Sequence, residues 1–114
     1  MLIVNDIDCS YGRETVLKDC SFHAQSGELY FLTGESGCGK TTLLKLMTGL
    51  LAPLKGEVIV GGRVLKDVPR KERAQLVGYV FQDFHLFPHL SAFENCVHPL
   101  LYVLGLSESE AKKR

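Results

Sequence analysis

The sequence lacks an excess of either charge, a long apolar run and a basic leader. Thirteen Lys and Arg residues balance thirteen Asp and Glu residues, so no global field draws the chain to nucleic acid or anionic lipid. The late apolar run 99–106 is far shorter than the roughly 20 residues that a membrane-spanning helix needs. Residues 1–6 contain no Lys or Arg of the kind that begins a signal peptide. We therefore expect a soluble, cytoplasmic protein.

The sequence also lacks patterned cysteines and the length for a second domain. Its four cysteines show no Cys-x-x-Cys spacing: Cys9, Cys20, Cys38 and Cys96. With no sign of export, we interpret them as reduced thiols rather than as a disulfide framework. A chain of 114 residues is long enough for one domain with a core, and too short for two.

What the sequence does have is a glycine-rich stretch with the pattern GxxxxGK[ST]. Its residues are Gly34, Glu35, Ser36, Gly37, Cys38, Gly39, Lys40 and Thr41. The apolar run Glu28–Thr33 before it predicts a buried strand, and the segment Lys40–Thr48 after it, closed by Gly49, predicts a helix. A strand, a glycine-rich loop and a helix start form an anion trap, because backbone N–H groups and the helix dipole favour negative charge. We predict that this loop binds a nucleoside triphosphate; the alternative is an ordinary glycine-rich turn.

The residue types of the loop suggest a role for each position. Lys40 would reach the β- and γ-phosphates, and the Thr41 hydroxyl would ligate Mg²⁺. The glycines allow the backbone to approach the phosphates closely and to adopt angles that side chains forbid. Thr42, the next residue of the predicted helix, is included among the expected nucleotide contacts.

Sheet and turn signals surround this loop. An alternating segment around 2–4, a turn at Cys9–Gly12 and a second segment from Thr15 to Phe22 predict two antiparallel strands. The segment Gly56–Leu65 predicts a hairpin in which Gly61-Gly62 form the two-residue turn. Val77–Phe81 predicts one more buried strand.

Helix signals occupy the rest of the chain. Pro69 to Gln75 predicts a short basic helix, with Pro69 suited to its first turn. After an irregular segment from Gln82 to Leu90, Ser91 and Glu94 form a Ser-x-x-Glu capping box at the start of another helix. The same spacing recurs at Ser107 and Glu110, so a last helix begins there.

In this order the segments resemble the N-terminal half of an ABC-transporter ATP-binding domain, over residues 1–114. The resemblance implies an α/β P-loop NTPase fold of the ABC ATPase type, with an N-terminal antiparallel β subdomain and an incomplete core sheet. The glycine-rich loop corresponds to the Walker A motif. Tyr11 matches the aromatic residue that stacks on adenine, and Val16 either lines the other side of the base or is an ordinary core valine. Gln82 matches the Q-loop glutamine, which contacts Mg²⁺ and the attacking water.

The same resemblance implies ATP and Mg²⁺ as cofactors, with Lys40 and Gln82 as catalytic residues and Thr41 and Gln82 at the metal. It implies a second ATP-binding subunit in a head-to-tail dimer, transmembrane permease partners, and a place on the inner face of the cell membrane. The stretch from Val80 to Asn95 looks most like the polar amino-acid importers, although lipoprotein-release and cell-division relatives carry similar sequence. The apolar residues of this stretch either dock a membrane subunit or anchor the loop to its own helices: Phe84, Leu86 and Phe87.

Three motifs that the family needs for hydrolysis are missing from this sequence. They are an apolar strand followed by Asp-Glu, an LSGGQ-type signature and a later switch histidine. We therefore interpret the chain as a fragment or truncated product that binds ATP without turning it over. Two other classes remain: a nucleotide-binding or interaction module that never hydrolyses, and a different P-loop enzyme such as a GTPase or a kinase. An Asn-Lys-x-Asp motif, needed by a GTPase, is absent.

Overall fold

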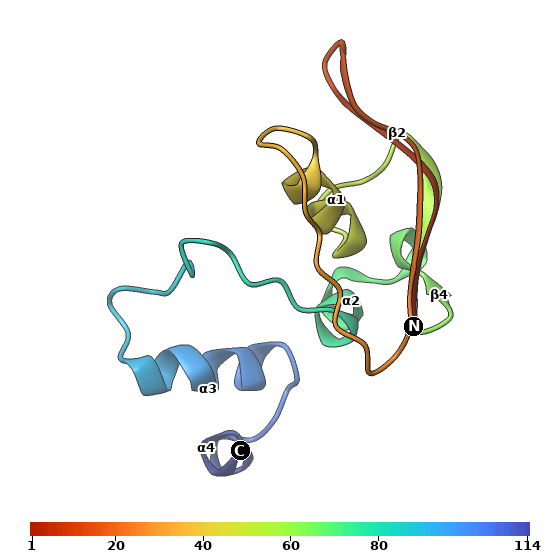
Figure 1. Ribbon diagram of the computed structural model, residues 1–114. Coiled ribbons are helices and arrows are strands. Elements are labelled where there is room, and N and C mark those ends of the chain that lie inside the picture. The colour runs from red at the N-terminus through yellow and green to blue at the C-terminus, as the bar shows by residue number, and fades with distance from the viewer. The chain divides into compact units, whose positions relative to one another are not determined.

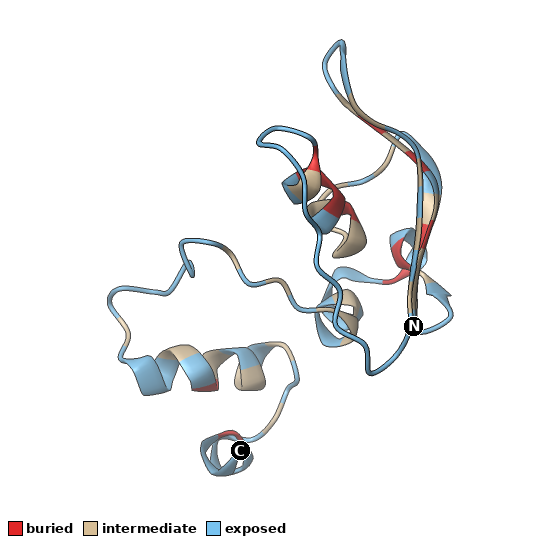
Figure 2. Cartoon of the chain, in the orientation of Figure 1, coloured by how far each residue is buried: buried red, intermediate tan, exposed pale blue.

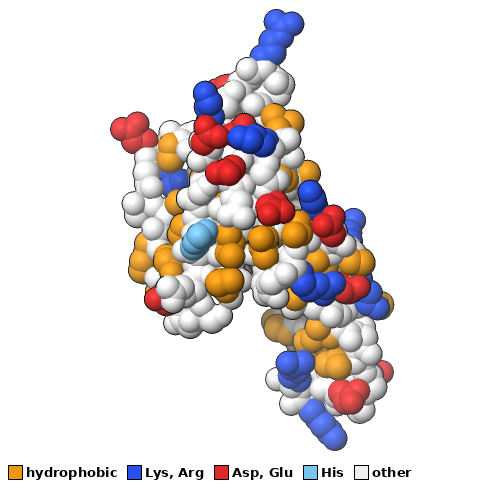
Figure 3. All heavy atoms as spheres, turned by 90° about the vertical axis from the view of Figure 1, so that its right-hand side faces the viewer, with side chains coloured by type: hydrophobic (Ala, Val, Ile, Leu, Met, Phe, Trp, Pro, Cys, Tyr) orange, Lys and Arg blue, Asp and Glu red, His pale blue; other side chains and the backbone are white.

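The computed structural model describes all 114 residues and divides into two compact units, Met1–Val77 and Gly78–Arg114. The first unit holds a four-stranded antiparallel sheet and the glycine-rich loop, and the second holds two helices (Figure 1). Acidic and basic side chains are interspersed on the face drawn in Figure 3, in keeping with the balanced composition.

The sheet of the first unit has the strand order β2-β1-β3-β4. Its strands are β1 (Leu2–Tyr11), β2 (Glu14–Ala24), β3 (Lys55–Val60) and β4 (Arg63–Val64). The Gly61-Gly62 hairpin turn is confirmed, because Val60 pairs with Arg63 and both glycines have positive φ angles, 58° and 80°. The turn predicted at Cys9–Gly12 was wrong in position: β1 continues to Tyr11, which pairs with Glu14.

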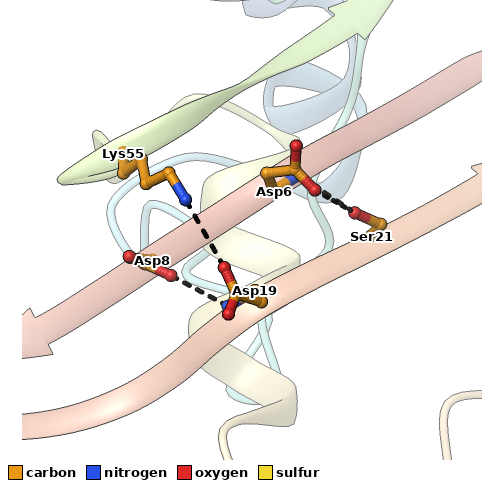
Figure 4. Close-up of polar contacts among 5 residues, drawn as sticks. All are labelled: Asp6, Asp8, Asp19, Ser21 and Lys55. Atoms are coloured by element: carbon orange, nitrogen blue, oxygen red, sulfur yellow. Dashed lines mark hydrogen bonds and ion pairs between the residues drawn. The ribbon is translucent and has the colours of Figure 1, made fainter.

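Two irregularities bend β1 and β2. Asp6 in β1 and Asp19 in β2 have left-handed φ angles of 46° and 47°, and the β1–β2 register shifts between Val4 and Ile7. An extra residue in one strand produces such a bulge. Side chains stabilise it: Ser21 donates to Asp6, Asp8 accepts the Asp19 N–H at 2.8 Å, and Lys55 lies 3.4 Å from the Asp19 carboxylate (Figure 4).

Helix α1 (Lys40–Met47) supplies the other half of the core of the first unit. Its Leu43 and Leu46 are buried and join an apolar cluster with residues of the sheet, whereas Leu44 is exposed. Figure 2 shows the buried positions concentrated on α1 and the sheet. The other buried members of the cluster are Val4, Ile7, Cys9, Val58 and Leu65.

Short helical segments complete this unit. A 3₁₀ turn, η1, spans Leu65–Asp67, and helix α2 spans Arg70–Leu76, which confirms the predicted basic helix. Pro69 lies one residue before the helix rather than in its first turn, and its carbonyl accepts the N–H of Arg73 at 2.9 Å. The Arg73 guanidinium in turn donates to the carbonyl oxygens of Gly49 and Val68 at 2.8 and 3.2 Å, which fastens α2 to the end of the α1 segment.

Two predicted strands do not form. Neither Glu28–Thr33 nor Val77–Phe81 enters a ladder, although both were expected to be buried strands. The reason is the lack of a neighbour: an apolar segment becomes a strand only when another strand satisfies its N–H and C=O groups. Leu29 and Phe31 are consequently 80% and 83% exposed.

The second unit contains α3 (Ala92–Tyr102) and α4 (Glu108–Lys113). Both predicted capping boxes are confirmed. Each serine side chain accepts the backbone N–H of the glutamate three residues later, and the carboxylate of that glutamate accepts the backbone N–H of the serine. Val97 of α3 and Ala111 of α4 are its buried apolar residues. No helix in either unit combines the length and the apolar character that crossing a membrane requires.

Candidate functional site: the glycine-rich loop and helix α1

The glycines of the loop adopt the backbone angles that the phosphate-binding pattern requires. Gly37 and Gly39 have φ angles of 82° and 94°, in a region that L side chains rarely enter. Gly39 is also buried, and a Cβ there would lie 2.9 Å from the Leu17 side chain and 3.2 Å from that of Val16. A Cβ on Gly37 would meet nothing within 4 Å. The loop is therefore pressed against β2 at Gly39 and open at Gly37.

The start of α1 presents unsatisfied donors. Gly39 is the residue that caps this helix, and no side chain bonds to the first-turn N–H groups. The first turn of an α-helix has no acceptors of its own for these groups. No acidic residue lies in this turn either, so no carboxylate competes for its positive end.

The ammonium of Lys40 lies across the loop. It donates to the carbonyl oxygens of Gly34 and Glu35 at 2.8 and 2.5 Å, and it is 3.6 Å from Cys38 Sγ. None of the ion pairs in the structure involves Lys40. A cation without a carboxylate partner therefore lies beside an uncapped helix start, and both features attract an anion.

These groups border a pocket of about 380 Å³. Tyr11, at the end of β1, is 51% exposed and lines one side, together with Val16 of β2. Thr41 is exposed and Thr42 is buried, both on the first turn of α1. The pocket is lined by eight of the predicted nucleotide residues: Tyr11, Val16, Ser36, Gly37, Gly39, Lys40, Thr41 and Thr42.

The other predicted residues lie elsewhere. Gly34 and Glu35 contribute carbonyl oxygens to Lys40, and Cys38 contributes its sulfur, but none of the three lines the pocket. Gln82 belongs to the second unit, where it is exposed in a turn. Its place at the metal stays a prediction.

Sequence reasoning missed one residue of this site. Leu17 forms the wall against which Gly39 is pressed. The alternation of Thr15, Val16 and Leu17 signalled a strand, but it gave no sign of what that strand would contact.

The donor set fits a triphosphate with its metal. Backbone N–H groups at a helix start and a lysine ammonium are the usual ligands of phosphate oxygens. The exposed Thr41 hydroxyl is an oxygen of the kind that Mg²⁺ binds, an ion that takes few protein ligands and completes its shell with phosphate oxygens and water.

Known proteins resemble this chain in sequence and in fold. The ABC transporter family model matches residues 17–114. The spermidine/putrescine import ATP-binding protein of Methylococcus capsulatus is 45% identical over 103 residues, covering 90% of this chain and 26% of that protein. The Fe(3+) ions import ATP-binding protein of Brucella suis is 40% identical over 104 residues, covering 91% of this chain and 29% of that protein. Both names refer to polyamine or iron import, so they lend no support to the predicted amino-acid branch.

A solved dimeric bacterial ABC transporter cassette is 31% identical, with a TM-score of 0.84, and the match covers 99% of this chain and 53% of that one. A cassette solved in a post-hydrolysis state with ADP and phosphate is 30% identical, with a TM-score of 0.82 and the same coverage. The chain thus spans between a quarter and a third of these curated relatives and about half of the solved cassettes. The expected fold class, the α/β P-loop fold of ABC ATPases with an N-terminal antiparallel subdomain, is confirmed. Because the family model matches most of the chain, the chain belongs to the ABC transporter family, and it resembles the N-terminal part of that family's ATP-binding domain.

Proposed function

We propose that this chain binds Mg²⁺–ATP as the P-loop part of an ABC import ATPase. One observation supports this most: the Lys40 ammonium, free of any ion pair, lies beside an uncapped helix start in a pocket that Tyr11 borders. In the proposed complex the triphosphate takes the place of the loop carbonyls as the partner of Lys40. The Thr41 hydroxyl ligates Mg²⁺, and the ring of Tyr11 stacks on the base.

Equilibrium dialysis against labelled ATP with Mg²⁺ tests the binding. A hydrogen bond to a charged group contributes about 1.5–3 kcal/mol, so Lys40→Ala is expected to weaken binding by roughly 10- to 150-fold. Lys45→Ala is the matched control, since it removes the same charge from the last turn of the same helix, outside the pocket. Its affinity should stay within about twofold of the wild type. Equal losses in the two variants would show that the site is not at Lys40.

We also propose that this chain alone does not hydrolyse ATP. Hydrolysis in P-loop enzymes needs a group that orients the attacking water. The acidic residues that follow Gln82 do not come after an apolar strand, as that role in this family would require: Asp83, Glu94, Glu108 and Glu110. Phosphate release should therefore equal that of the Lys40→Ala variant; release above that level contradicts the proposal.

For the whole system we propose solute import. The supporting relatives are named for import of polyamines and of ferric ions. The amino-acid alternative depends on the stretch from Val80 to Asn95 alone. The proposed partners are a second ATP-binding subunit and membrane permeases, which would hold the protein at the inner face of the membrane. Uptake of labelled putrescine, Fe³⁺ and glutamine by cells with and without the gene distinguishes these solutes, and unchanged uptake of all three would count against import of these classes.

A further inference from the structure

Asn95, near the start of α3, is hydrogen-bonded to the loop that precedes the helix. Its Oδ1 accepts the N–H of Phe87 at 2.9 Å. Its Nδ2 lies 3.1 Å from the carbonyl oxygen of Phe87, 3.2 Å from that of Leu90 and 3.0 Å from that of Ser91. A carboxamide has two N–H donors, so three carbonyl oxygens share them. One half-buried side chain thus holds both ends of the segment 87–91.

The turn before this loop is closed by its own contacts. The N–H of Phe84 donates to the carbonyl of Phe81 at 3.1 Å, and the N–H of His85 donates to that of Asp83 at 2.6 Å. The rings of Phe81 and His85 stack with centroids 4.2 Å apart. Phe84 and His85 both have left-handed φ angles, 58° and 48°, which persist only where surrounding contacts fix them. Gln82 lies inside this closed turn.

Only Leu86 separates the closed turn 81–85 from the segment that Asn95 holds. We propose that Asn95 is a positioning residue for Gln82: it joins the Gln82 turn to α3, so that the two move as one piece. The functional meaning of this link depends on the proposed role of Gln82 at the metal and water. The link itself belongs to the second unit, and it can be tested without nucleotide.

The neighbouring residue provides a control. Glu94 also bonds the start of the helix, but both hydrogen bonds of its carboxylate go to Ser91, from the N–H at 2.8 Å and the hydroxyl at 2.7 Å. Substitution of Glu94 therefore disturbs the helix cap and leaves the contacts to Phe87 in place. Substitution of Asn95 removes the contacts to Phe87 and leaves the capping box in place.

Amide exchange and ¹H–¹⁵N NMR on the 114-residue chain test the proposal. A net hydrogen bond is worth about 0.5–1.5 kcal/mol, so Asn95→Ala should speed exchange of the Phe87 N–H by roughly 2- to 13-fold. The Gln82 amide signal should shift in the same variant. In Glu94→Gln the Ser91 amide should change, while the Phe87 and Gln82 amides should not.

A second variant separates positioning from a general loss of structure. Asn95→Asp keeps the size and one acceptor, but at neutral pH its second carboxylate oxygen faces three carbonyl oxygens, and this repulsion should displace the side chain and open its bond with the Phe87 N–H. Below the pKa of the introduced carboxyl group, the protonated oxygen can donate again. Protection of the Phe87 N–H, relative to Asn95→Ala at the same pH, should therefore return as the pH falls through that pKa.

Two results would overturn the proposal. One is an unchanged Gln82 signal in Asn95→Ala, and the other is a loss of protection that spreads equally to the Val97 amide in the middle of α3. Failure of the proposed nucleotide binding would appear separately, as equal ATP affinities of the wild type and Lys40→Ala, with the Gln82 shift still present.

Discussion

Gly37 and Gly39 allow the loop geometry to be tested with two alanine substitutions that differ in one respect. Both residues have left-handed φ angles, 82° and 94°, so each alanine incurs a backbone cost of about 1–2 kcal/mol. Only at Gly39 does the new Cβ meet other atoms, with Leu17 at 2.9 Å and Val16 at 3.2 Å. Overpacking of this kind costs about a further 1–3 kcal/mol.

The expected loss of unfolding free energy is therefore about 1–2 kcal/mol for Gly37→Ala and about 2–5 kcal/mol for Gly39→Ala. Urea unfolding followed by circular dichroism measures both. With a denaturant slope of about 2 kcal/mol/M, the midpoint of Gly39→Ala should lie roughly 1 M below that of Gly37→Ala. ATP affinity should not follow stability, because Gly37 lines the pocket and a Cβ there would take space from the phosphates in the proposed complex. Equal midpoints, or a neutral Gly39→Ala, would refute the packing of the loop against β2.

Two further predictions concern a glycine of the sheet in the first unit and the N-terminal cap of α3 in the second. Gly56→Ala should lower the unfolding free energy by about 2–5 kcal/mol, because its Cβ would lie 2.2 and 2.5 Å from backbone oxygens of β1 and its φ is 83°. Gly61→Ala is the control in the same urea assay. Its φ is 58° and its Cβ would meet open space, so it should lower the unfolding free energy by only about 1–2 kcal/mol. Hydrogen bonds from the Ser91 side chain and backbone lower the pKa of Glu94, so the cap of α3 should hold above about pH 4.3, the ordinary glutamate pKa, and weaken as the pH falls through the lower folded-state pKa. The loss of helical circular dichroism on acidification should be larger in the wild type than in Glu94→Gln, in which only the corresponding Glu110 cap of α4 still titrates; identical pH profiles would contradict it.

Local signals in the sequence were sufficient where neighbouring residues alone decide the structure. The Gly61-Gly62 turn is determined by the left-handed angles that glycine permits, and the Ser91 cap by a side chain that bonds its own helix. The helix after the glycine-rich loop was predicted as Lys40–Thr48 from the residues between the loop and Gly49, and α1 spans Lys40–Met47.

Signals that depend on distant partners failed. Glu28–Thr33 and Val77–Phe81 have the composition of strands but no strand beside them. The contact of Leu17 with Gly39 and the hydrogen bonds of Asn95 depend on tertiary placement, which no short pattern encodes. The bulge at Asp6 was not predicted either, because an aspartate in a strand has no unique sequence signature.

That bulge determines which way the tip of the hairpin faces. Side chains alternate along a regular strand, yet Val4 and Ile7 are both buried although they are three residues apart. Because Asp6 is an extra residue in the strand, the side chains after it alternate in the opposite phase. Ile7, Cys9 and Tyr11 therefore share one side of β1. A strand of the same length without the bulge would turn Ile7 and Cys9 away from the core and Tyr11 away from the pocket, whereas deletion of Asp6 would keep all three on the side of Val4, so the bulge keeps an added residue from disturbing the wall of the pocket.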